Sequence, residues 1–148
     1  MNYWDTVLQE LCGNIQNDEL RNYCFTGRPL RVAEELLSDE LDKDVKELVN
    51  TFGWNIPDLD ELEGCIELAI SIDTQDEVKV AKALLRAAEK YLESGESETV
   101  SDAIFKALWD TRVDDVVTNI VAQRLSNAIN LCREERNTKK NESLVYNF

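Results

Sequence analysis

Residues 75–94 read QDEVKVAKALLRAAEKYLES, and residues 112–136 read RVDDVVTNIVAQRLSNAINLCREER. In both stretches apolar side chains recur three and four positions apart, which is the spacing of an amphipathic α-helix. When successive residues are placed about 100° apart, the apolar positions cover half of the circumference in the first stretch and more than half in the second. These stretches are predicted to be the two central helices of an all-α protein.

The rest of the chain predicts shorter helices, which local start and stop signals delimit. They are expected at about 3–15, 18–25, 29–37, 39–52, 57–72 and from Ser97 or Ser101 to Trp109. Asn17 and Ser38 are predicted N-caps, and Thr74 with Glu77 forms a predicted capping box. Gly95 is expected to end the helix over 75–94. Because the connections are short, we expect an irregular bundle or a short stack of antiparallel helix hairpins, with about seven or eight helices.

The length of 148 residues fits one domain of ordinary size. An all-helical domain is expected over residues 1–136. Residues 137–148 form a tail that is polar and basic at first and then apolar, ending in LVYNF at 144–148. This tail is expected either to be a frayed end or to dock on a partner or on a second copy of the chain.

Acidic side chains are concentrated between residues 34 and 63. Eleven acids and two bases there give a net charge of −9, out of −14 for the whole chain. On the predicted helix 39–52, three of these acids lie along one flank of the apolar stripe, with no base on that flank. A second acidic row is expected on the helix over 57–72, and antiparallel packing would join the two rows. The predicted partner-binding residues are Glu40, Asp44, Glu47, Trp54, Asp58, Asp60, Glu61, Glu63 and Glu67.

This acidic block is interpreted as a docking surface for a basic protein, since charged surfaces of this kind speed association. Trp54, in the loop beside the block, is expected to act as a hot spot of that surface. The alternative is an acidic face that only keeps the protein soluble. A nucleic-acid mimic is a special case of the first interpretation. Direct nucleic-acid binding is not expected, because the basic residues near the C-terminus are too few.

The composition speaks against most catalytic chemistry. The chain has no histidine, which removes the commonest general base and the commonest zinc ligand. Glu34 and Glu35, followed by Glu40, Asp44 and Glu47, are loosely similar to the paired carboxylates of the all-α nucleotide pyrophosphohydrolases, which hold Mg²⁺. The resemblance fails on spacing, because neither Glu34 nor Glu35 has an acid three residues on. We therefore expect no enzyme, no metal site and no cofactor, and keep a carboxylate–Mg²⁺ enzyme as the least favoured alternative.

The four cysteines are far apart and lie on or beside apolar stripes, so we expect reduced thiols in a core, with disulfides as the alternative. No stretch is long and apolar enough to span a membrane, and the N-terminus lacks the pattern of a signal peptide. These features favour a cytoplasmic location. Arg124 lies on the apolar arc of the helix over 112–136 and is expected to pair with a carboxylate or to face a partner. Trp4, Trp54 and Trp109 are expected in the core by default, and the hot spot is the alternative for Trp54.

Three functions follow from these observations. The favoured one is a small, acidic, non-catalytic protein that inhibits or neutralises a basic protein, as immunity and anti-defence proteins do. The second is a helical adaptor or scaffold, which includes a homodimer and would use an apolar contact surface. The third is the carboxylate–Mg²⁺ enzyme.

Overall fold

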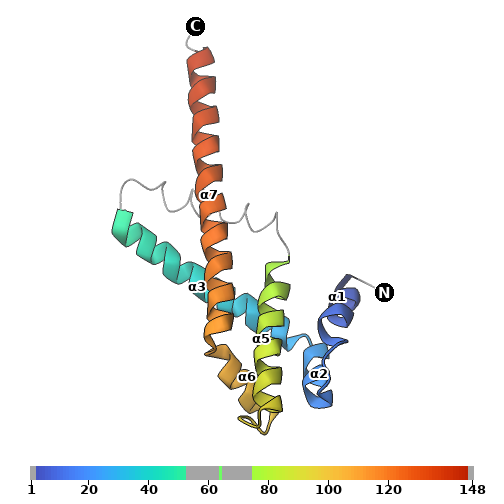
Figure 1. Ribbon diagram of the computed structural model, residues 1–148. Coiled ribbons are helices and arrows are strands. Elements are labelled where there is room, and N and C mark those ends of the chain that lie inside the picture. Colours follow the sequence, from blue (N-terminus) through green and yellow to red (C-terminus); the bar gives the residue numbers. More distant parts are fainter. Residues whose placement is uncertain (1–2, 53–63, 65–74, 147–148) are drawn as a thin grey trace. The chain divides into compact units, whose positions relative to one another are not determined.

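A computed structural model of the protein describes residues 3–52, 64 and 75–146, with side chains described at 5–47, 64 and 75–132. Within these ranges the chain is all-helical and contains no strand, which confirms the predicted class. Six helices are seen in this part of the chain, fewer than the seven or eight predicted. They are α1 (Tyr3–Cys12), α2 (Asp18–Phe25), α3 (Arg28–Phe52), α5 (Asp76–Glu93), α6 (Val100–Leu108) and α7 (Thr111–Tyr146) (Figure 1). None of the described helices has the length and apolar content needed to cross a membrane.

The pair α1 and α2 is joined covalently by a disulfide between Cys12 and Cys24, whose Cα atoms lie 5.6 Å apart. Cys132 on α7 is also disulfide-bonded. The prediction of reduced core thiols is therefore wrong. The apolar setting was correct, since Cys12 and Cys24 are fully buried, but periodicity cannot show that two distant stripes bring their sulfur atoms into bonding contact.

The helix α2 has the bounds that the sequence predicts. Asn17 accepts a hydrogen bond from the amide of Leu20 at 3.0 Å, as an N-cap should. After α2 the chain reverses at Gly27, whose φ of +80° lies in the left-handed region that glycine adopts without steric cost. The next helix, α3, begins at Arg28, so Pro29 lies in its first turn, where proline is tolerated.

The helix α3 continues from Arg28 to Phe52, and the predicted break at Ser38 does not occur. Serine is favoured at an N-cap, but inside a helix it costs only a few tenths of a kcal/mol more than alanine. No glycine or proline follows Pro29 within α3 to interrupt the backbone hydrogen bonds. The two helices predicted here are therefore one.

The helices α5 and α6 form an antiparallel hairpin, drawn in yellow-green and gold in Figure 1. Gly95 ends α5 with a φ of +80°, as predicted. The N-cap position of α5 is Gln75, which makes no side-chain cap bond, and Thr74 of the predicted capping box lies outside the described residues. Two acids in the first turn favour this helix start through the helix dipole. The N-cap of α6 is Thr99, and not Ser97 or Ser101, at which this helix was expected to start.

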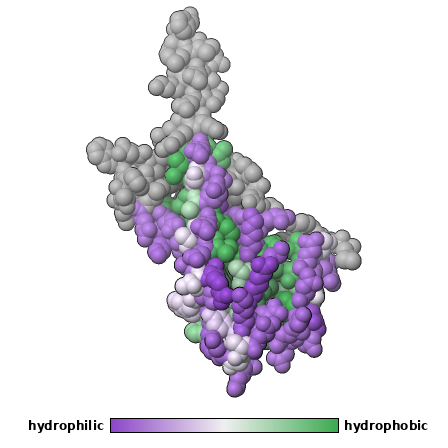
Figure 2. All heavy atoms as spheres, viewed as in Figure 1, coloured by the Kyte–Doolittle hydropathy of each residue, from purple (hydrophilic) through white to green (hydrophobic). Residues whose placement is uncertain are grey.

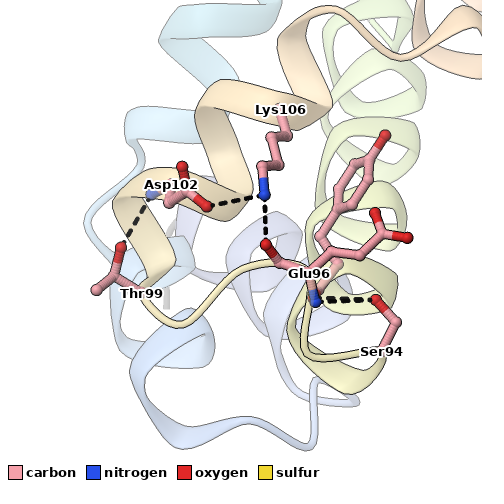
Figure 3. Close-up of polar contacts among 6 residues, drawn as sticks. Ser94, Glu96, Thr99, Asp102 and Lys106 are labelled. Carbon is pink, nitrogen blue, oxygen red and sulfur yellow. Dashed lines mark hydrogen bonds and ion pairs between the residues drawn. The ribbon is translucent and has the colours of Figure 1, made fainter.

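The loop between α5 and α6 is fixed by the polar contacts that Figure 3 shows. The hydroxyl of Thr99 accepts a hydrogen bond from the amide of Asp102 at 3.1 Å. Lys106, one turn further along α6, lies 3.2 Å from the carboxylate of Asp102 and also donates to the carbonyl of Glu96. The hydroxyl of Ser94 accepts from the amide of Glu96 at 3.4 Å.

The helix α7 extends to Tyr146, about ten residues beyond the predicted end. Helical structure therefore covers most of the segment that was expected to be a tail, because residues 137–146 contain no glycine or proline to stop it. The division into a domain over 1–136 and a tail over 137–148 stays a prediction.

Two compact units are found in the chain. The first comprises Met1–Glu40 and Gln75–Ile120, and the second comprises Leu41–Thr74 and Val121–Phe148. In the first unit α5 contacts α1, α2 and α6. Apolar positions on α5 and on the described part of α7 are buried, as expected of central helices. They are Val80, Ala81, Leu84, Leu85, Ala87 and Ala88 on α5, and Val113, Val117, Val121, Leu125, Ala128 and Cys132 on α7. Hydrophilic residues cover most of the coloured surface in Figure 2.

Candidate partner-binding surface

The continuous helix α3 aligns the first three predicted partner-binding residues. Positions 40, 44 and 47 are four and three residues apart, so they fall within about 60° of each other around the helix. Glu40, Asp44 and Glu47 therefore lie on one flank of α3. We call these three residues the acidic flank. Glu40 and Asp44 are half-buried, whereas Glu47 is exposed.

Most carboxylates of α3 have no ion-pair partner among the described residues. Residues 34–47 contain seven acids and two bases, which gives a net charge of −5. Six of the seven acids make no ion pair with any residue that the structure describes. These six are Glu34, Glu35, Asp39, Asp42, Asp44 and Glu47. Glu40 differs from them, because it takes part in an interaction of its own. A positively charged partner could therefore bind these carboxylates without first breaking an ion pair between described residues.

The remaining predicted partner-binding residues lie outside the described part of the chain. They are Trp54, Asp58, Asp60, Glu61, Glu63 and Glu67, and the joining of two acidic rows therefore stays a prediction. Trp4 also lies outside the residues whose side chains are described.

Trp109 does not lie in the core, so that prediction is wrong. It is the C-cap residue of α6, and 78% of its surface is exposed. Phe105, one turn earlier on α6, is 61% exposed. The buried face of α6 is formed by small and aliphatic residues, Ala103, Ile104 and Ala107. The spacing of four residues between Phe105 and Trp109 is the only sequence signal for this aromatic pair, and spacing alone does not distinguish a buried face from an exposed one.

A buried carboxylate between α6 and α7, which sequence reasoning missed, organises a polar cluster. Asp110 accepts hydrogen bonds from the Arg112 amide at 2.9 Å and from Arg112 Nε and Nη2, both at 3.1 Å. The hydroxyl of Tyr91, on α5, donates to Asp110 Oδ2 at 2.8 Å. Asp110 is therefore the N-cap of α7 and links the start of that helix to α5.

The partners of Asp110 stabilise its ionised form. The side chain of Arg112 holds the pKa of Asp110 well below its usual range, although burial acts in the opposite direction. The amide of Arg112 and the hydroxyl of Tyr91 lower it further. The same bond to Asp110 raises the pKa of the Tyr91 hydroxyl. An ionised carboxylate that accepts four hydrogen bonds is suited to a structural role, because all its lone pairs are engaged.

Arg124 on α7 is buried, with 8% of its surface exposed, and it takes part in an interaction. Its expected position on the apolar arc is thus confirmed, whereas its expected carboxylate partner stays a prediction. Among the described residues no group of three or more histidine, cysteine or acidic side chains is arranged to hold a metal ion.

Comparisons with protein families, curated proteins and solved structures find no match to this chain.

Proposed function

We propose that this protein is a small, acidic, non-catalytic binding protein that neutralises or inhibits a basic protein. The acidic flank of α3 would form the described part of its contact surface. The observation that carries the proposal is the row of carboxylates on one helix, most of which make no ion pair with a residue that the structure describes. Such a surface would steer a basic partner toward the helix, and complementary charges on that partner would complete the contact.

Charge reversal on the acidic flank tests this proposal. The variant Glu40→Lys, Asp44→Lys, Glu47→Lys changes the net charge by +6, which is twice the three charges that are reversed. Wild type and variant would be immobilised and exposed to an extract of the native host, at low and at moderate salt. We expect a basic protein to bind the wild type, to dissociate as the salt rises, and to be lost from the variant.

A matched control separates local docking from net charge. Glu93, Glu96 and Glu98 are exposed residues around the end of α5, away from α3 in the sequence. Replacing all three by lysine changes the net charge by the same amount. Retention of the partner by this control, with loss from the α3 variant, would support the acidic flank. Equal loss from both variants would mean that only net charge matters, and unchanged binding by the α3 variant would contradict the proposal.

The second candidate function is a helical adaptor or homodimer, and the exposed aromatic pair on α6 favours it. Phe105 and Trp109 are large apolar side chains that the fold leaves in water. Aromatic residues of this kind are enriched among the hot spots of protein interfaces. Sedimentation of the wild type against Phe105→Ser, Trp109→Ser would test this candidate. A dimer that dissociates in the double variant would support it, and a monomeric wild type would argue against the homodimer.

The cysteines bear on location. Disulfides persist in oxidising compartments and are rare in the cytosol. The bond between Cys12 and Cys24, together with the disulfide of Cys132, therefore weighs against the cytoplasmic location that the sequence favours. Trapping free thiols during extraction from the native host would decide between an oxidising compartment and the cytosol. Unmodified cysteines would place the protein in an oxidising compartment, and four modified thiols would restore the cytoplasmic prediction.

A further inference from the structure

A groove lies between α1 and α5 in the first unit. Its volume is about 220 Å³, and its apolar floor consists of Leu11, Ile15 and Leu85. Each of these three side chains is less than 9% exposed. Sites for drug-sized ligands measure about 300–1,000 Å³, while a closed cavity of about 150 Å³ holds benzene. The groove therefore suits a ligand with one apolar side chain and a small head group.

The wall formed by the connection between α1 and α2 is held in place by several bonds. Cys12, which forms the disulfide with Cys24, is the residue directly after Leu11. The carbonyl of Ile15 accepts a hydrogen bond from Arg21 Nη1 at 3.0 Å, and the amide of Ile15 donates to the carbonyl of Cys12 at 3.1 Å. This wall is thus preorganised, which lowers the entropic cost of binding.

The rim of the groove carries two positive and two negative side chains. Lys82 and Arg86 are one turn apart on α5, and Glu89 follows on the same helix, while Glu10 comes from α1. None of these four makes an ion pair with a residue that the structure describes. Two bases and two acids give this lining a net charge of zero, which matches a ligand that carries one charge of each sign.

We propose that this groove binds a small zwitterion with an apolar side chain, which is the chemistry of a free aliphatic α-amino acid. Lys82 and Arg86 receive the carboxylate, and Glu10 and Glu89 receive the ammonium group. Leu11, Ile15 and Leu85 contact the apolar side chain. This site does not involve the acidic flank of α3, so the two proposals stand or fall separately.

Titration of the full, oxidised chain with L-leucine, followed by methyl NMR, tests the site. We expect saturable shifts of the Leu11, Ile15 and Leu85 methyl signals with a Kd of about 1 mM. Leucinamide, which lacks the carboxylate, and N-acetyl-leucine, which lacks the ammonium, should each bind at least ~10-fold more weakly, the effect of losing one charged contact.

Matched variants assign the recognition to named residues. Lys82→Ala, Arg86→Ala should raise the Kd for L-leucine by at least ~10-fold and should bind leucinamide as the wild type does. Lys90→Ala removes an exposed charge from α5 outside the groove and should leave the Kd unchanged. The proposal is overturned if L-leucine gives no saturable shift at ~20 mM, well above the expected Kd. Equal affinity for all three ligands, or an unchanged Kd in the double variant, overturns it as well.

Discussion

Replacement of Asp110 tests whether the polar cluster at the start of α7 holds the fold together. Asp110→Ala removes the acceptor for the Arg112 amide and for the Tyr91 hydroxyl. Loss of an N-cap costs about 1 kcal/mol, and loss of a hydrogen bond to a charged group costs about 1.5–3 kcal/mol. Only 6% of the Asp110 side chain is exposed, so water replaces these bonds poorly. We expect the free energy of unfolding to fall by about 2–4 kcal/mol.

Urea and thermal unfolding of the oxidised protein, followed by circular dichroism, would measure this loss. For a chain of this length the melting temperature should fall by about 4–16 °C. Asp110→Asn keeps an oxygen that can cap α7 but loses the charge, so its stability should lie between those of Asp110→Ala and the wild type. Asp114→Ala, which removes an exposed acid in the first turn of α7, is the matched control and should unfold close to the wild type. If Asp110→Ala and Asp114→Ala unfold alike, Asp110 does not organise this region.

The pH dependence of stability gives an independent measure of the same cluster. The pKa of Asp110 is lower in the folded protein than in the unfolded chain, mainly because of Arg112. Its stabilising contribution is therefore complete above the unfolded pKa of about 3.9 and is lost as the pH falls toward the folded value. We expect the wild type to lose stability more steeply than Asp110→Asn below about pH 5. If the free energy of unfolding falls with pH in the same way for both proteins, the pKa of Asp110 is not lowered in the folded state.

Three further changes have expected outcomes. Gly95→Ala should lower the free energy of unfolding by about 1–2 kcal/mol, because alanine is strained at a φ of +80°; an unchanged urea midpoint would contradict this. Removing the disulfide by Cys12→Ala, Cys24→Ala should destabilise the protein by about 2–4 kcal/mol, since the bond closes a loop of 12 residues; a variant that melts with the wild type would show that the bond is dispensable. Phe105→Ser, Trp109→Ser should leave the monomer's melting temperature nearly unchanged, because both side chains are already exposed, and a large drop would place them in the core.

The parts of the fold that the sequence predicts well are those set by local chemistry. The bounds of α2 follow from Asn17, whose side chain bonds to an amide three residues away. The end of α5 follows from Gly95, which adopts a φ that other residues avoid. The prediction that Ser38 begins a new helix was wrong because serine is only weakly unfavourable inside a helix. The neighbouring turns therefore decide whether a serine caps a helix or lies within it.

Features that depend on contacts between distant residues could not be predicted. The sequence shows that Cys12 and Cys24 lie on apolar stripes, but not that these stripes meet. It likewise gives no sign that Tyr91 reaches Asp110, 19 positions later. Trp109 was expected in the core because tryptophan is apolar, yet small residues on the opposite face of α6 allow closer packing and are the ones buried. For the acidic flank, helical spacing alone was sufficient to predict that the three carboxylates lie along one side of a helix, while their role in binding stays a prediction.

The distribution of ion pairs bears on whether the charge of α3 is only a device for solubility. Elsewhere in the described chain, some acids pair with a base one turn away, as Asp18 does with Arg21, Asp76 with Lys79 and Asp102 with Lys106, whereas others make no ion pair with a described residue. These pairs show that the chain does place bases where they offset acids. On α3, six of seven acids between residues 34 and 47 make no ion pair with a described residue, although Lys43 and Lys46 lie on the same helix. Like charges one turn apart, such as Asp44 and Glu47, cost a few tenths of a kcal/mol. Solubility alone does not require these acids to lie on one flank, because the same acids spread over the surface would keep the protein equally soluble without the repulsion. Docking of a basic protein, in contrast, is favoured when the acids lie together.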